Sequence, residues 1–365
     1  MKEYNILSKE NSAIMRGVAI LFIMLHNFLH YGSFGFSKEN EMSFSAEKQE
    51  VFLNAISAPD ANIFGEFFSF IGWIGVPVFI FLTGYGLAKK YPIGCPFDRR
   101  KYLRHNYLKL FCVMFPAILF FLCMDIKNGM WESFFKHIFS LSMLHGLYYP
   151  QLKISPGVYW YFSLAFQFYI FYLIFRKYLT STVLLLLSTL SLIILYWLCL
   201  SDFVDVLSIY RHCITGWFPV FALGLYAASS DTPLLKYMTM CGSGSIFSIV
   251  LTIVASVFLM ALVLLMGGNC ASWVFIPLVA LFFFFSITRL LLNTVHLSFF
   301  FRWIGGVSAV IFVCHPVIRT IYMALHINKL VNNVYIGVII YFVMVLLLTY
   351  PYMYVFGKIK SRIIN

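Results

Sequence analysis

Long apolar runs alternate with short polar segments along almost the whole chain. Each run approaches the roughly 20 apolar residues that an α-helix needs to cross the hydrocarbon core of a bilayer once. The pattern therefore predicts an all-α polytopic membrane protein, a bundle of about ten transmembrane helices. We recognise no appended soluble segment and no clear internal repeat, so we expect residues 1–365 to form a single transmembrane domain. The predicted spans cover residues 14–32, 65–88, 107–124, 158–175, 181–200, 213–229, 244–266, 271–292, 303–324 and 335–356.

The composition agrees with this prediction and excludes other classes of protein. Of the 365 residues, 61% are hydrophobic and only 11% are charged, whereas a soluble domain carries roughly 25% charged residues. The formal net charge is +12, but the basic residues lie between the apolar runs, where the positive-inside rule places them, so we expect no nucleic-acid partner. The eight cysteines are scattered singly, and their spacing predicts neither a disulfide framework nor a metal site.

The charged residues between the runs indicate how the bundle is oriented. Lys and Arg accumulate in alternate connections, which marks the cytoplasmic side of a membrane. We therefore expect a multi-pass protein of the plasma or inner membrane with both termini in the cytoplasm. The acidic loop 33–64 and the aromatic-rich loop 125–157 are predicted to face outward. The connection after the second span carries the densest basic group: Lys89, Lys90, Arg99, Arg100, Lys101, Arg104 and Lys109.

The first apolar run contains Arg16, His26, Asn27 and His30. An ionisable side chain inside a membrane helix costs at least about 2.5 kcal/mol on insertion scales, so such groups usually face a protein interior or a wet cavity. At 100° and 1.5 Å per residue the four side chains share one side of the helix, with His26 roughly 15 Å deeper than Arg16. An imidazole can take and return a proton near neutral pH, so His26 or His30 is a candidate catalytic base. The alternative is a pair of buried histidines that only bridge helices.

Two other spans carry candidate binding residues. Thr83 and Tyr85 add hydroxyls near glycines at the end of the second span, where the segment either contacts a ligand or only packs closely against another helix. Ser308 and His315 lie seven residues apart in the ninth span, hence on one helix face. Arg302 marks the cytoplasmic start of that span, and a straight helix places His315 roughly 20 Å further along.

The basic run after the second span has two possible uses. Arg100, Arg104 and Lys109 are suited to hold the phosphates of a nucleotide such as that of acyl-CoA. The alternative is that they set the topology and contact anionic lipid headgroups. The run lacks a glycine-rich phosphate loop that would strengthen the first interpretation.

Six segments together resemble the acyltransferase 3 family of membrane-bound acyltransferases. In that family a basic residue and a histidine share the first helix, and the later segments occur in the same order as here. Each match is weak alone, but together they cover nearly the whole chain. The segments are MRGVAILFIMLH (15–26), GVPVFIFLTGYGL (75–87), RHNYLKLFCVMFP (104–116), WYFSLAFQFY (160–169), GWFPVFALGL (216–225) and IGGVSAVIFVCHP (304–316).

The resemblance implies transfer of an acyl group from cytoplasmic acyl-CoA to a hydroxyl of an extracytoplasmic carbohydrate or lipid-linked glycan. We expect the acyl group to be acetyl and the donor to be acetyl-CoA. Under this reading Arg16 holds the donor or its developing charge. His26, helped or replaced by His30, deprotonates the acceptor, and a transient acyl-imidazole is an open alternative. No metal is expected. The other segments supply the candidate substrate-binding residues Thr83, Tyr85, Trp160, Gln167, Tyr169, Ser308 and His315.

The sequence departs from the family pattern at two points. The family usually places one more residue between the basic residue and the histidine than Arg16 and His26 allow, so both His26 and His30 stay candidates for the base. The acidic residue often found in the fourth segment is replaced by Ala165. The alternative function is a proton-coupled transporter or flippase of a glycan or lipid, in which the same histidines relay protons. A non-catalytic membrane scaffold is a third possibility.

Overall fold

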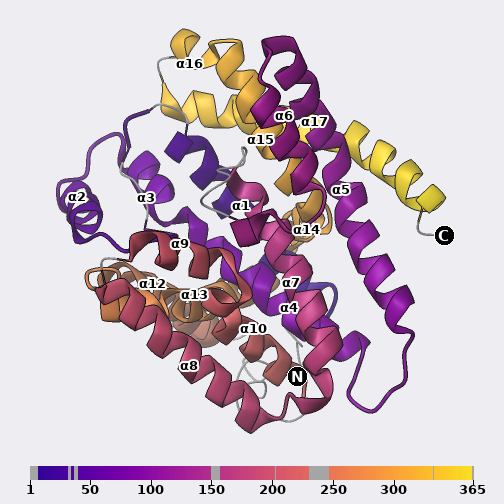
Figure 1. Cartoon of the computed structure of the whole chain (residues 1–365). Coiled ribbons are helices and arrows are strands. Elements are labelled where there is room, and N and C mark those ends of the chain that lie inside the picture. Colours follow the sequence, from indigo (N-terminus) through magenta and orange to yellow (C-terminus); the bar gives the residue numbers. More distant parts are fainter. Residues whose placement is uncertain are drawn as a thin grey trace.

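The computed structural model describes residues 7–31, 34–36, 40–148, 157–201, 203–229, 246–331 and 333–363. Residues 149–156 and most of 32–39, which belong to the two predicted outer loops, lie outside this set. Within the described ranges all regular elements are helical, as predicted (Figure 1). They are α1 (Asn11–Tyr31), α2 (Ala46–Ser57), α3 (Ile63–Ile71), η1 (Gly72–Gly75), α4 (Val76–Lys90), α5 (Arg99–Asn128), α6 (Trp131–Ser140), η2 (His145–Tyr148), η3 (Gly157–Tyr159), α7 (Trp160–Phe175), η4 (Arg176–Tyr178), α8 (Ser181–Leu200), α9 (Val204–His212), α10 (Ile214–Ala228), α12 (Ile246–Met266), α13 (Cys270–Leu292), α14 (Val295–Gly306), α15 (Ser308–Ala324), α16 (Ile327–Leu330) and α17 (Val334–Ile363).

The helices confirm an all-α polytopic membrane protein. In the described part of the chain, eight helical segments are long and apolar enough to cross a membrane, and the bent pair α14 and α15 makes a ninth. The second segment, Ile63–Lys90, consists of α3, η1 and α4 in succession. The remaining predicted span, 213–229, corresponds to α10, which has only 15 residues and is buried along most of its length.

Helix α1 lies in the middle of the bundle (Figure 1). It packs against α3, η1, α4, α13, α14 and α15. Its closest neighbour is α14, because glycines bring the two backbones together. A Cβ on Gly305 would lie 1.7 Å from the carbonyl oxygen of Ala13, and one on Gly17 would lie 2.1 Å from that of Phe301. The polar groups of α1 are therefore held inside protein rather than in lipid.

The ninth span is not the straight helix that the sequence predicts. The chain bends by 72° between α14 and α15, at Val307. Arg302 therefore lies on α14, whereas Ser308 and His315 lie on α15, and the expected straight path from Arg302 to His315 is wrong. The bend turns α15 along α1 while α14 keeps its close contact with the start of α1.

The second span is also interrupted, and the interruption lies against α1. A Cβ on Gly72 would come within 2.6 Å of the Cβ of His26, and one on Gly75 within 2.4 Å of the carbonyl oxygen of Ala19. Any larger residue at Gly72 would push the 3₁₀ turn η1 away from the histidine. The glycines of this turn therefore set how closely the second span encloses His26.

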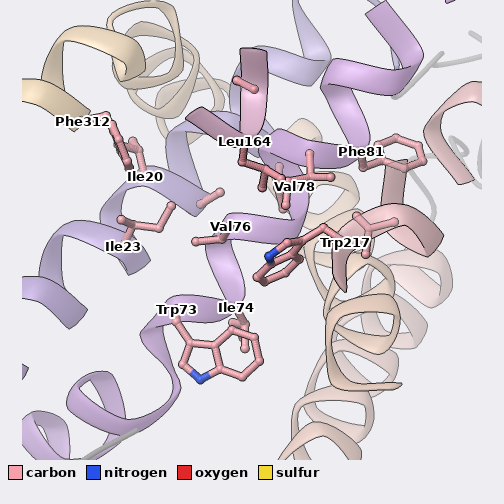
Figure 2. Close-up of a cluster of buried hydrophobic side chains, with 14 of the residues drawn as sticks. Ile20, Ile23, Trp73, Ile74, Val76, Val78, Phe81, Leu164, Trp217 and Phe312 are labelled. Carbon is pink, nitrogen blue, oxygen red and sulfur yellow. The ribbon is translucent and has the colours of Figure 1, made fainter. Parts of the chain in front are cut away.

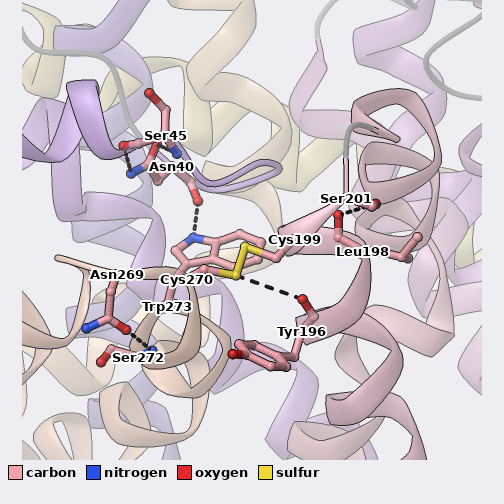
Figure 3. The surroundings of a disulfide bond; sticks show 10 residues. All are labelled: Asn40, Ser45, Tyr196, Leu198, Cys199, Ser201, Asn269, Cys270, Ser272 and Trp273. Carbon is pink, nitrogen blue, oxygen red and sulfur yellow. Dashed lines mark hydrogen bonds between the residues drawn. A yellow bond between two sulfur atoms is a disulfide. The ribbon is translucent and has the colours of Figure 1, made fainter.

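A disulfide joins Cys199 at the end of α8 to Cys270 at the start of α13 (Figure 3). The prediction of no disulfide framework is thus wrong, because residues 71 positions apart in the sequence meet only in the tertiary structure. Their meeting requires an even number of membrane crossings between them, and α12 alone would make one. We therefore expect α10 to cross as well, although its 15 residues are fewer than those of the membrane-spanning segments described above.

A buried arginine fastens the loop before α2 to the bundle. Arg211, at the end of α9, is 1% exposed, and its guanidinium lies 4.1 Å from the ring centre of Trp217 and 5.0 Å from that of Trp273. Its Nη2 donates to the carbonyl oxygen of Glu41 at 2.9 Å, and Trp273 Nε1 donates to that of Asn40 at 2.6 Å (Figure 3). Burial lowers the pKa of Arg211 to about 10, and the Glu41 charge partly opposes this shift.

Candidate functional site

A cavity of about 530 Å³ opens between α1, α4, α5, α7, α15 and the end of α17. On each helix the lining residues follow helical spacing, so one face of each helix is used. On α1 these are Arg16 and Ile23, and on α15 they are Ser308, Ala309 and Phe312. The cavity therefore follows α1 inward from the end that carries Arg16.

One end of the cavity is basic. Lys90 ends α4, and His105 and Lys109 lie one helical turn apart on α5; all three line the cavity together with Arg16. Lys90 and Lys109 are exposed, whereas Arg16 and His105 are half-buried. Cationic groups converging on one opening favour an anionic ligand such as a phosphate.

The other end is apolar and aromatic. Ile23, Phe79, Tyr161, Phe162 and Phe312 line it. The ring centres of Tyr161 and Phe162 lie 5.5 and 5.6 Å from that of Phe312. Figure 2 shows Phe312 beside Ile20 of α1, with Ile23 one turn further along. A ligand reaching this end leaves water and meets hydrocarbon walls.

The backbone carbonyl of Gly305 holds two polar side chains at the cavity wall. Arg16 Nε donates to it at 3.4 Å, and Ser308 Oγ donates to it at 2.9 Å. The close packing of Gly305 on α1 and the bend at Val307 bring this carbonyl to Arg16. The rest of the guanidinium fork can then address a ligand in the cavity.

His26 and His30 lie beyond the inner end of the cavity and do not line it. His26 is 3% exposed, and its Nδ1 lies 3.2 Å from the carbonyl oxygen of Phe68 on α3. A carbonyl oxygen only accepts, so this contact favours the tautomer that carries its proton on Nδ1 and its lone pair on Nε2. The His30 ring stacks on that of His26, with centroids 5.3 Å apart and planes 21° apart. Ile23 and His26 are three residues apart, about 4.5 Å along the helix axis.

His315 contacts Phe312 but does not line the cavity. It is fully buried, its ring meets that of Phe312 edge-on at 5.6 Å, and it is within electrostatic reach of His26 and Arg319. Its Nδ1 lies 3.2 Å from the carbonyl oxygen of Ile311. Nε2 of His315 has no hydrogen-bond partner among the residues that the structure describes, which makes it a buried acceptor next to the histidine pair of α1.

The family's sequence model, described as an acyltransferase domain, matches residues 12–355. The chain belongs to the acyltransferase 3 family. The match covers nearly the whole chain, from the start of α1 into α17. No curated protein and no solved structure matches the sequence.

Several predicted site residues of this acyltransferase line the cavity: Arg16, Thr83, Lys109, Tyr169 and Ser308. Thr83 Oγ1 donates to the carbonyl oxygen of Phe79 at 2.8 Å. The Tyr161 side chain is hydrogen-bonded to Thr83. These contacts anchor two walls of the cavity to each other.

Other predicted residues lie away from the cavity of the acyltransferase. Arg100 and Arg104 are exposed on α5, and Tyr85 carries Lys89 over its ring at 5.8 Å. Gln167 Oε1 accepts from the backbone N–H of Ile214 at 3.0 Å, which caps the start of α10. Trp160 stacks on Trp217 with ring centres 5.8 Å apart. That these residues contact substrate stays a prediction. In the structure the Gln167 side chain accepts a hydrogen bond from α10, and the Trp160 ring packs on Trp217.

Among the lining residues that the sequence did not single out are His105, Tyr161 and Phe312. His105 stands in the quoted 104–116 segment, four residues before Lys109, so its helical spacing was a usable signal. Tyr161 follows the predicted residue Trp160 in the sequence but lies on a different face of α7, and of the two only Tyr161 lines the cavity. Phe312 carries no signal, because it is one of 41 phenylalanines in the chain.

Three more buried histidines, His137, His145 and His212, lie outside the membrane-spanning segments. Burial lowers the pKa of His212, at the end of α9, to about 4, and the positive charges of Arg211 and His145 add to this shift. Burial also lowers the pKa of His145, whose Nε2 lies 2.9 Å from the carbonyl oxygen of Tyr159. His212 is therefore neutral at pH 7.

Proposed function

We propose that the protein transfers an acyl group from cytoplasmic acyl-CoA to a hydroxyl of an extracytoplasmic carbohydrate or lipid-linked glycan. The acyl group we propose is acetyl. The family membership carries the acyltransferase activity. The choice of acyl-CoA as donor depends on one observation: the cavity joins a basic mouth to an apolar inner end that stops one helical turn from His26.

The two ends of the cavity match the two ends of this donor. His105 and Lys109 at the mouth suit the phosphates of CoA. Arg16 lies about 15 Å from His26 along the helix, so we assign it to the donor's arm rather than to the reacting carbonyl. The apolar inner end suits the thioester and the acyl group, whose transfer from water into such surroundings is favourable.

The tautomer favoured at His26 suits general base catalysis. Nε2 takes the proton of the acceptor hydroxyl while the hydroxyl oxygen attacks the thioester carbonyl. The carbon–sulfur bond then breaks, and the CoA thiolate leaves towards the mouth and takes up a proton. His30, stacked on His26, is the second candidate for the same role, and an acyl-imidazole intermediate is the alternative route.

The orientation of the bundle supports a donor site on the cytoplasmic side. Disulfides persist on the oxidising side of a membrane, and the Cys199–Cys270 bond lies at the ends of α8 and α13. An alternating path through ten crossings puts that side opposite both termini and opposite the basic connection before α5. This agrees with cytoplasmic termini in a plasma or inner membrane.

The test uses membranes that contain the full chain and acetyl-CoA labelled in its acetyl group. We expect label in the glycan fraction, and His26→Ala is expected to lower its rate of appearance by roughly 10²–10⁴-fold, the usual contribution of a general base. His296→Ala is the matched control, since His296 is exposed on α14. Transfer that is absent from the wild-type protein, or unaffected by His26→Ala together with His30→Ala, would refute the proposal.

One observation favours the transporter alternative. Broken membrane helices often line transport sites, and α14 and α15 form such a broken span. A proton-coupled transporter would move unlabelled glycan or lipid in response to a pH gradient and would not consume acetyl-CoA. Measuring both substrate movement and thioester consumption in the same vesicles separates the two functions.

A further inference from the structure

Phe312 is one of the bulky side chains at the inner end of the cavity. It is 9% exposed. Its ring contacts Tyr161 and Phe162, which also line the cavity, and it contacts His315, which does not line it. The ring therefore links the lining of the donor cavity to the buried histidine.

The position of the Phe312 ring limits how long an acyl chain can be when its thioester carbonyl reaches His26. In the proposed reaction the thioester carbonyl must come close to His26, which lies just past Ile23. The carbons of the acyl chain that follow the carbonyl then meet the aromatic wall. Because protein interiors are close-packed, an acyl chain that would overlap the Phe312 ring does not bind.

We propose that Phe312 determines the acyl-chain length that the enzyme accepts, by closing the cavity just beyond the thioester. This inference rests on the proposed acyl transfer from acyl-CoA. Replacing the benzyl side chain of Phe312 with the methyl group of alanine extends the cavity towards Ile20, whose hydrocarbon side chain suits a longer acyl chain (Figure 2).

The experiment compares acetyl-, butyryl- and hexanoyl-CoA, each labelled in the acyl group, in membranes containing wild type, Phe312→Ala or Phe312→Leu. The measured quantity is the ratio of butyryl to acetyl label in the glycan fraction. A methylene refused by an apolar pocket is worth about 10–200-fold in specificity, so we expect the ratio to rise at least tenfold in Phe312→Ala. Phe312→Leu keeps more of the packing and is expected to give a smaller rise.

The ratio does not depend on how much of a variant folds, because both rates come from the same preparation. Phe81→Ala is the matched control: Phe81 is a buried phenylalanine that does not line the cavity, and its ratio is expected to equal that of wild type. Equal ratios in wild type and both Phe312 variants would overturn the inference while leaving acyl transfer intact. Absence of transfer from all three thioesters in wild type would overturn the proposed function itself.

Discussion

The imidazole rings of His26 and His30 stack with their centroids 5.3 Å apart. The four-residue spacing on α1 produces this arrangement, because residues four apart lie one above the other on a helix. Nδ1 of His26 contacts the carbonyl oxygen of Phe68 on α3, and His26 lies one helical turn nearer than His30 to Ile23, which lines the cavity. The pair is thus one site with two unequal members.

This inequality predicts a non-additive effect of the two substitutions on activity. We expect His26→Ala to cost more than His30→Ala, and the double variant to cost little beyond His26→Ala, because groups that act as one unit are not additive. Initial rates of label transfer from acetyl-CoA by the three variants give the result. Losses that multiply in the double variant would mean that the two histidines act independently.

The position of Lys109 at the cavity mouth predicts a selective effect on donor binding. Lys109→Ala is expected to raise the KM for acetyl-CoA by a few-fold, since an exposed ion pair is worth at most about 1 kcal/mol. Added salt should reduce the difference from wild type. Arg100→Ala removes a charge outside the cavity from the same helix and is the control; an equal rise in its KM would show that the whole basic run, rather than the mouth, attracts the donor.

The disulfide predicts a redox-dependent thermal stability. Closing a loop of 71 residues stabilises a chain by roughly 4 kcal/mol in the chain-entropy model. We expect a reducing agent to lower the Tm of the detergent-purified protein and to leave the Tm of Cys199→Ser unchanged. Cys95→Ser, at an exposed free cysteine, should respond like wild type. Two reactive thiols at positions 199 and 270 in unreduced protein would contradict the pairing and the crossing of α10.

The low pKa of His212 predicts a loss of stability in acid. Its pKa of about 4 in the fold is below its ordinary value of about 6.5, so the unfolded chain binds the proton more tightly. Stability is complete above pH 6.5 and falls as the pH drops towards 4, by at most about 3 kcal/mol. Tm measured between pH 4 and 7 should fall less for His212→Gln than for wild type or the exposed-site control His296→Gln. Parallel curves would assign the acid sensitivity to another group.

The sequence alone determined the class of fold and the side of the bundle where chemistry is expected. Lipid offers no hydrogen bonds to the backbone, so a membrane span must be a long apolar helix, and this requirement is visible in ten separate runs. The same rule makes Arg16, His26 and His30 conspicuous, since an ionisable group is expensive in lipid. Helix periodicity then put them on one side of α1, which the structure places at the centre of the bundle.

Only the tertiary structure decided which residues share the cavity. Trp160, Gln167 and Tyr169 stand on one helix, yet only Tyr169 lines the cavity, because the faces of α7 are assigned by its neighbours. The bend at Val307 and the pairing of Cys199 with Cys270 have the same origin: they depend on contacts between segments far apart in the chain, which local patterns do not encode. Phe312 is the clearest case, since a phenylalanine in a membrane helix has the same local signature whether it faces lipid or closes a cavity.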